Sequence, residues 1–156
     1  MLGLDKFDLD AIAVALQDQT GYEYFHLINP LTGEIAFWSR DGGIDGNHPV
    51  DLDDLDLIVI HPLPSSVWYQ DMADFADGIS DEQAGRRLAR AIRGRGAFRH
   101  FKDELHQEYP ELLAAWHEFS DLRARRRAVE WLADNALVER VTSDRFAAEH
   151  PDPGLP

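Results

Sequence analysis

The chain has 156 residues, of which 44% are hydrophobic and 28% are charged, and its formal net charge at pH 7 is -14. This length and composition predict one globular domain, which we place at residues 1–146, and a loose C-terminal tail at residues 147–156. The excess of acidic residues argues against general nucleic-acid binding, because contact with phosphates depends mostly on Lys and Arg side chains.

Three further features narrow the class of protein. The chain has no cysteine, no apolar run that approaches the roughly 18 residues of a membrane span, and no basic and then apolar signal at its start. We therefore expect a cytoplasmic protein that has no membrane partner.

A helix and a small antiparallel sheet are predicted for the first part of the chain. Apolar residues at helical spacing predict a helix from about residue 8 to residue 19, with Gly21 as its stop. Residues 22–39 predict a β-hairpin with its turn at 29–33, because aromatic and β-branched residues fill both arms. A third strand is predicted at residues 55–60.

The loop before the third strand is rich in Gly and Asp. Its aspartates could be calcium ligands: Asp41, Asp45, Asp51, Asp53, Asp54 and Asp56. The ordered spacing of an EF-hand loop, with its fixed glycine and its final glutamate, is missing. We therefore interpret the loop as a solvated acidic segment, and we expect neither a metal nor a cofactor.

A second helix is predicted after the third strand. Pro62 and Pro64 end the strand, because proline cannot donate a hydrogen bond to a sheet. Ser65 or Ser66 is expected to cap the helix, which Gly78 ends. Its buried stripe is expected to contain Trp68, Met72 and Phe75.

The only strongly basic stretch lies at residues 84–105, AGRRLARAIRGRGAFRHFKDEL, and predicts two short helices around the tripeptide Gly94-Arg95-Gly96. Ser80 and Gln83 predict a capping box that starts the first helix near Asp81. The apolar faces of the two helices are expected to contain Ala84, Leu88, Ala91, Ile92, Phe98, Phe101 and Leu105.

This stretch differs in charge from everything before it. Residues 1–84 contain two Lys or Arg and seventeen acids, whereas residues 85–102 contain seven Lys or Arg and no acid. The arginines lie opposite the apolar face, and the free backbone N–H groups at 96–99 add a positive helix end. The candidate residues for binding an anion or a partner are Arg86, Arg90, Arg93, Gly94, Arg95, Gly96, Arg99 and Lys102.

Two interpretations of these cations stay open. They can be neutralised by the chain's own carboxylates, which would make the stretch a stabilising hinge. They can instead hold an external anion, such as a phosphate or a carboxylate of a partner.

A long helix follows, and Pro110 opens it. Its apolar stripe contains Leu112, Trp116 and Phe119. Arg123 extends this stripe, and a cation in such a position needs a carboxylate or a carbonyl group. We therefore predict a structural ion pair between Arg123 and an acid from another element, with Asp71 and Asp74 as candidates.

Three runs of the sequence resemble the signature of an uncharacterised bacterial family, numbered 0158 among families of unknown function: RRLARAIRGRGAFRHFKDEL, PELLAAWHEF and RRRAVEWL. The resemblance extends upstream to TGEIAFWS and IHPLPSSVWYQDMADFADGISDE, and covers roughly residues 9–137. It implies a bacterial cytoplasmic protein of α+β type, and it supplies no functional residue. His100 departs from the resemblance, because the family more usually has a basic residue at this position.

Together the elements predict an α+β fold, with an N-terminal helix and a small antiparallel sheet, a β-hairpin plus a third strand, followed by a C-terminal helical bundle. The aromatic core is expected to contain Phe25, Phe37, Trp68, Phe75, Phe98, Phe101, Trp116, Phe119 and Trp131.

For function, we expect a non-enzymatic binding or regulatory module that holds an acidic partner or an anion through the basic stretch. One alternative is contact with a nucleic-acid backbone, because a GxG between two helices resembles a helix-hairpin-helix motif, although Arg95 stands where such motifs have an apolar residue. Another is an uncharacterised hydrolase-type enzyme, for which His100 and Glu104 share a helix face, although the chain has no HExxH, P-loop or Gly-x-Ser-x-Gly motif. A third is an acidic scaffold that occupies a basic partner.

Overall fold

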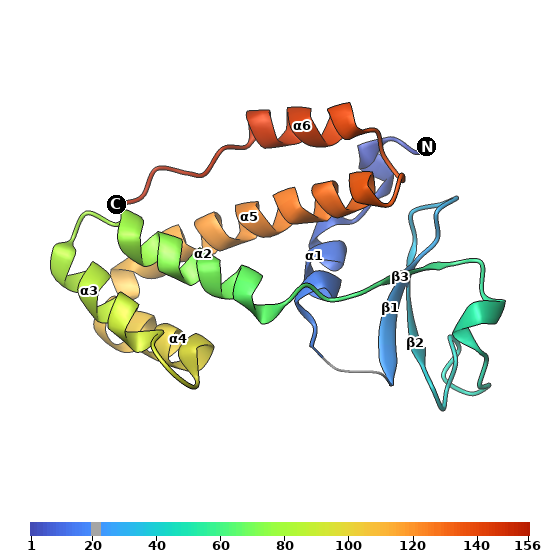
Figure 1. The fold of residues 1–156 in the computed structure, drawn as a ribbon, viewed down its shortest axis with the longest axis horizontal. Coiled ribbons are helices and arrows are strands. Elements are labelled where there is room, and N and C mark those ends of the chain that lie inside the picture. The colour runs from blue at the N-terminus through green and yellow to red at the C-terminus, as the bar shows by residue number, and fades with distance from the viewer. Residues whose placement is uncertain (20–22) are drawn as a thin grey trace. The chain divides into compact units, whose positions relative to one another are not determined.

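The computed structural model describes residues 1–19 and 23–156, and its elements confirm the predicted α+β class (Figure 1). The helices are α1 (Leu9–Gln17), α2 (Ser65–Gly78), α3 (Glu82–Ala91), α4 (Ala97–Glu108), α5 (Leu113–Asp134) and α6 (Arg140–Glu149). The strands are β1 (Tyr24–Ile28), β2 (Ile35–Ser39) and β3 (Ile58–Ile60). Single 3-10 turns are found at Leu4–Lys6, Leu52–Asp54 and Pro110–Leu112. Two sequence predictions, the stop at Gly21 and the strand start at Tyr22, lie outside the described residues.

The described chain divides into two compact units. Unit 1 contains Met1–Leu63 and Ala124–His150, and unit 2 contains Pro64–Arg123 and Pro151–Pro156. From the sequence we expected one domain at 1–146 and a loose tail at 147–156. In the structure, α6 runs on to Glu149, and the residues after His150 belong to unit 2.

The sheet of unit 1 has the strand order β2-β1-β3, and both pairings are antiparallel. The hairpin is closed by the Gly33 N–H, which donates to the Asn29 carbonyl at 2.8 Å. Gly33 has a φ of 81°, a conformation that favours glycine. The third strand is shorter than predicted, because the 3-10 turn before it already uses the Leu55 N–H, which donates to the Leu52 carbonyl at 3.1 Å.

The N-cap of α1 is Asp8, whose side chain accepts a hydrogen bond from the Ala11 N–H at 3.0 Å.

The core of unit 1 is aliphatic. Fully buried side chains come from α1, the sheet and the second half of α5: Ile12, Leu16, Leu27, Ile28, Ile60, Val129 and Leu132. The prediction that Phe37 is buried was wrong. It is 47% exposed, because strand alternation turns it to the face opposite Trp38, where it stacks on Tyr24.

The core of unit 2 is aromatic. Ring contacts join α2, α4 and the first half of α5, with centroids 4.8–6.3 Å apart among Phe75, Phe101, Trp116 and Phe119. The predicted serine cap of α2 was wrong, because Pro64 occupies the N-cap position and Ser65 is already helical. Among the helices of the described residues, none is long and apolar enough to cross a membrane.

The start of α3 also differs from the sequence prediction. The Asp81 side chain accepts from the Gln83 N–H at 3.0 Å and from the Ala84 N–H at 3.2 Å, so Asp81 is the N-cap. The predicted capping box was therefore wrong. The Ser80 N–H donates instead to the Pro156 carbonyl at 2.7 Å.

Candidate functional site

The basic stretch forms a helical hairpin in unit 2, made of α3, a turn and α4, which we call the basic hairpin (residues 82–108). Gly94 and Gly96 have φ values of 80° and 72°, so both adopt the left-handed conformation. A Cβ at Gly94 would meet no heavy atom within 4 Å, so the backbone conformation alone favours glycine there. The chain therefore reverses between the two helices within a few residues.

Apolar side chains fix the basic hairpin to the core of unit 2. Ala84 and Leu88 of α3 and Phe101 and Leu105 of α4 are fully buried. The prediction for Phe98 was wrong, because its side chain is 41% exposed. Ala97, Phe101 and Leu105 occupy positions i, i+4 and i+8 of the buried face. With the helix rotated in this way, Phe98 points partly towards solvent.

Two of the candidate cations have acidic neighbours on their own helix. Arg86 lies 3.8 Å from Glu82, and Arg99 lies 3.9 Å from Asp103, each pair at i, i+4. Both pairs are solvent-exposed and near the distance limit of an ion pair. Such pairs contribute about 0.3–0.5 kcal/mol and exchange readily with other partners.

Four candidate cations are exposed: Arg90, Arg93, Arg95 and Lys102. Within residues 1–19 and 23–156, their side chains make no hydrogen bond or ion pair. The hinge interpretation required the chain's own carboxylates to neutralise the stretch. For these four side chains, the described carboxylates do not.

Arg87 is not among the candidate residues predicted from the sequence, and in the structure it bridges α3 and α4. Its guanidinium lies 2.8 Å from Glu104 and 3.7 Å from Glu108, and 5.6 Å from the ring centroid of Tyr109. Desolvation by itself would lower the pKa of Arg87, but Glu104, Tyr109 and Glu108 outweigh it and raise that pKa. Arg87 therefore ties α3 to α4. The signal in the sequence was the pair of glutamates at i, i+4 on the second helix.

The two residues considered as an acid–base pair for an enzyme have different neighbours. Glu104 holds Arg87, whereas His100 lies beside the turn, with its ring 3.5 Å from the position that a Cβ at Gly96 would take. In the part of the chain that the structure describes, no group of three or more His, Asp or Glu side chains is arranged to hold a metal ion.

Arg123 is the centre of a partly buried charge network in unit 2. Its guanidinium lies 2.6 Å from Asp74, 2.8 Å from Asp152 and 3.2 Å from Asp71. It also lies 4.4 Å from the ring centroid of Phe119. The hydrogen bond with Asp152 raises the pKa of Arg123, desolvation opposes this, and the bonds with Asp74 and Asp71 add to it. The two acids that the sequence proposed as partners both contact Arg123.

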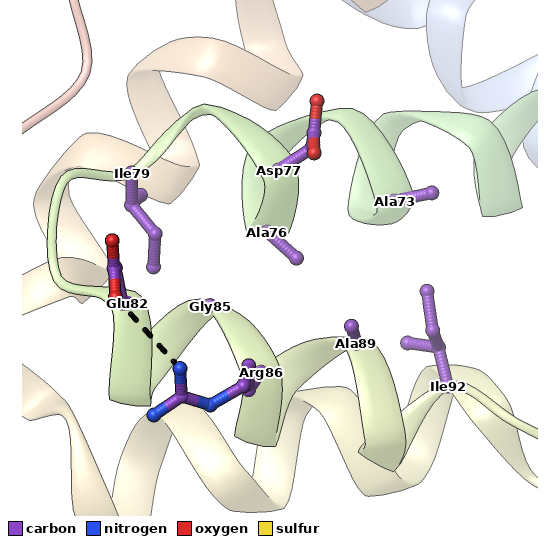
Figure 2. Close-up of a pocket in the computed structure, with 9 residues that line it drawn as sticks. All are labelled: Ala73, Ala76, Asp77, Ile79, Glu82, Gly85, Arg86, Ala89 and Ile92. Atoms are coloured by element: carbon purple, nitrogen blue, oxygen red, sulfur yellow. Dashed lines mark ion pairs between the residues drawn. The ribbon is translucent and has the colours of Figure 1, made fainter.

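A groove lies between α2 and α3, and Arg86 of the basic hairpin lines it (Figure 2). It has a volume of about 420 Å³. Six of its lining residues are small or aliphatic: Ala73, Ala76, Ile79, Gly85, Ala89 and Ile92. A Cβ at Gly85 would lie 2.8 Å from the Ala76 carbonyl oxygen, so glycine lets the two helices approach closely. Arg86 and its partner Glu82 form the α3 side of the groove.

Comparison with known proteins identifies a family that the chain matches over most of its length. A family model described as "Uncharacterised protein family (UPF0158)" matches residues 4–150. A UPF0158 protein of Pseudomonas aeruginosa is 31% identical to this chain over 155 residues, which cover 96% of this chain and 95% of that protein. No solved structure matches the chain.

Proposed function

Since the chain belongs to the uncharacterised protein family UPF0158, its function has to be inferred from its own residues, and we propose that it is a non-enzymatic binding or regulatory module. Its basic hairpin holds an acidic partner. The candidate contact residues are those of the sequence analysis: Arg86, Arg90, Arg93, Gly94, Arg95, Gly96, Arg99 and Lys102.

One observation carries the proposal: four exposed cations stay without an ion-pair partner among the described residues of an acidic chain. The chain has 29 Asp and Glu against 15 Lys and Arg. With this excess of carboxylates, intramolecular pairing of every cation would be easy to achieve. Arg90, Arg93, Arg95 and Lys102 instead face solvent. A local cationic surface on an anionic protein attracts the anionic groups of a partner, whereas the acidic remainder of the protein repels them.

Besides these side chains, backbone N–H groups at the turn can donate hydrogen bonds to an anion. The first hydrogen bond of α4 runs from the His100 N–H to the Gly96 carbonyl, at 2.9 Å. The N–H groups of residues 97–99 therefore precede the helical hydrogen bonds, and Gly96 has no side chain to cap them. Carboxylates are favoured at such a helix start, and guanidinium groups can bind them through two parallel hydrogen bonds.

A binding experiment tests the proposal. The probe is a fluorescently labelled glutamate-rich peptide, followed by fluorescence anisotropy at low and high salt. Charge reversal by Arg93→Glu with Arg95→Glu should weaken binding by at least about tenfold, because it replaces two attractive contacts with repulsive ones. The expected binding of the unchanged protein falls as salt rises.

A matched control distinguishes a specific effect of the hairpin cations from a general effect of net charge. Lys6→Glu with Arg145→Glu makes the same change in charge at exposed sites of unit 1 and should leave the affinity within about twofold. An equal loss in both double variants, or no loss in the hairpin variant, would refute the proposal. The same series with a DNA duplex and an RNA single strand tests the nucleic-acid alternative, which tighter binding of those probes would favour.

The cytoplasmic location and the bacterial origin that the sequence suggested stay predictions. Cell fractionation would test the first.

A further inference from the structure

We propose that the groove between α2 and α3 receives an amphipathic helix of the acidic partner, with the acidic flank of that helix facing α3. This inference rests on the function proposed above. It adds a second contact surface to the basic hairpin and specifies the form in which the partner presents its carboxylates.

The shape of the groove suits bulky apolar side chains. Its walls contain small side chains on both helices, chiefly Ala73 and Ala76 of α2 and Ala89 of α3, and Figure 2 shows Ala76 and Ala89 between the two helices. Ala76 is 5% exposed, so Ala73 and Ala89 supply most of the accessible alanine surface. The groove has a volume of about 420 Å³ and is open to water. Apolar side chains of a partner would release this water from alanine surfaces, which favours binding.

The elements beside the groove favour a helix as the occupant. Backbone N–H and C=O groups within α2 and α3 are used inside the helices, so the groove offers no edge for a partner strand. A helix needs no such edge. It can place side chains at i, i+3 or i+4, and i+7 into the groove of a helix pair, as helices do in bundles.

Charges on the two sides of the groove set the orientation of the occupant. On the α3 side, Arg86 lines the groove, and Arg90 and Arg93 follow it at one-turn spacing. Asp77 stands on the α2 side, exposed to solvent. On the α3 side the three arginines outnumber Glu82, so an acidic flank is attracted to α3 and repelled from α2. The Arg86–Glu82 pair is exposed and 3.8 Å long, so a carboxylate of the partner can compete with Glu82.

The test uses a synthetic helical peptide of about 18 residues, with leucines on one face and glutamates along one flank. A second peptide carries lysines in place of the glutamates. The glutamate peptide should bind the full chain at least about tenfold more tightly than the lysine peptide. Equal affinities would refute the charge argument.

A variant of the groove separates this proposal from the general one. Ala73→Gln with Ala89→Gln fills the groove with polar side chains and leaves the net charge unchanged, and glutamine keeps a high helix propensity. The affinity for the glutamate peptide should fall about tenfold. Ala114→Gln, at an exposed position of α5 in unit 2, is the control and should leave the affinity unchanged.

The outcomes distinguish the two proposals. If charge reversal at Arg93 and Arg95 abolishes binding while the groove variant binds normally, the partner does not enter the groove, and only the basic hairpin is supported. If the groove variant weakens binding and charge reversal does not, the hairpin proposal is refuted and the groove proposal is not. Amide chemical shifts of the unchanged protein give a measurement independent of variant folding. The Gly85 and Ala89 signals must shift on peptide addition, and shifts confined to residues 93–102 would overturn the groove proposal.

Discussion

Replacement of Arg123 by methionine should destabilise the protein strongly, since it removes the cation that faces three carboxylates. The Arg123 side chain is 15% exposed and the Asp71 side chain is 4% exposed, whereas those of Asp74 and Asp152 are 38% exposed. Removal of one partner of a buried pair costs 3–5 kcal/mol in general. Because two of the three acids can turn towards water, we expect the lower end, about 3 kcal/mol.

The buried position of Asp71 leads to a second expectation. Most of the loss should come from the charge of Asp71, which is left buried, and not from the lost attraction. Adding Asp71→Asn to Arg123→Met removes this charge with little change of shape, so the double variant should be more stable than Arg123→Met alone by about 1–2 kcal/mol. A simple sum of two lost contacts predicts the opposite order.

Urea unfolding followed by tryptophan fluorescence measures the four proteins of this double-mutant cycle, and Trp116 in the core of unit 2 reports on the region. A loss of about 3 kcal/mol corresponds to a Tm lower by about 6–12 °C for a chain of this size. Arg145→Met, at an exposed position, should change stability by less than about 0.5 kcal/mol. A cost below about 1 kcal/mol for Arg123→Met, or a double variant less stable than the single one, would refute this account of the network.

Two further predictions concern the cap of α3 and the response to acid. Asp81→Ala should cost about 1 kcal/mol in urea unfolding and Ser80→Ala much less, because Asp81 accepts the hydrogen bonds at the helix start; the reverse order would restore the capping box. Desolvation by itself would raise the pKa of Asp74, but hydrogen bonds from Arg123 and Gln70 outweigh it, so this pKa lies below its ordinary value. The folded state therefore takes up a proton less readily than the unfolded state. The stability from Asp74 is present above the ordinary Asp pKa of about 3.9 and is lost as the pH falls below it. Urea midpoints between about pH 6 and pH 3 should fall less steeply in Asp74→Asn than in the unchanged protein, and equal slopes would contradict the assignment.

Much of the fold could be predicted from local patterns. Alternating aromatic and β-branched residues around the turn at Gly33 predict the hairpin, and the two glycines around Arg95 predict the reversal between α3 and α4. Both patterns depend on backbone conformations that few other residues adopt.

Two of the errors arose where adjacent residues are equally suited to the same role, so that the prediction can be displaced by one residue. Ala97 and Phe98 are both apolar and begin the same helix, so periodicity cannot say which one faces the core. Ser80 and Asp81 are both good N-cap residues in adjacent positions. The choice in each case is made by contacts with other elements, which a single helix does not encode.

The candidate site had the same limit. Local charge identifies the cations of the basic hairpin, but the bridging position of Arg87 depends on Glu104 and Glu108, which come from the facing helix. Pairing across two helices requires their relative rotation, and the sequence of each helix leaves this rotation open.

Gly85 has a consequence for the comparison of relatives. Because any Cβ at this position would lie 2.8 Å from the Ala76 carbonyl oxygen, only glycine permits the present close approach of α3 to the backbone of α2 at this point. A relative with a larger residue here must hold its two helices farther apart. The identity of this one residue can therefore sort family members into those that share the narrow helix spacing and those that have lost it.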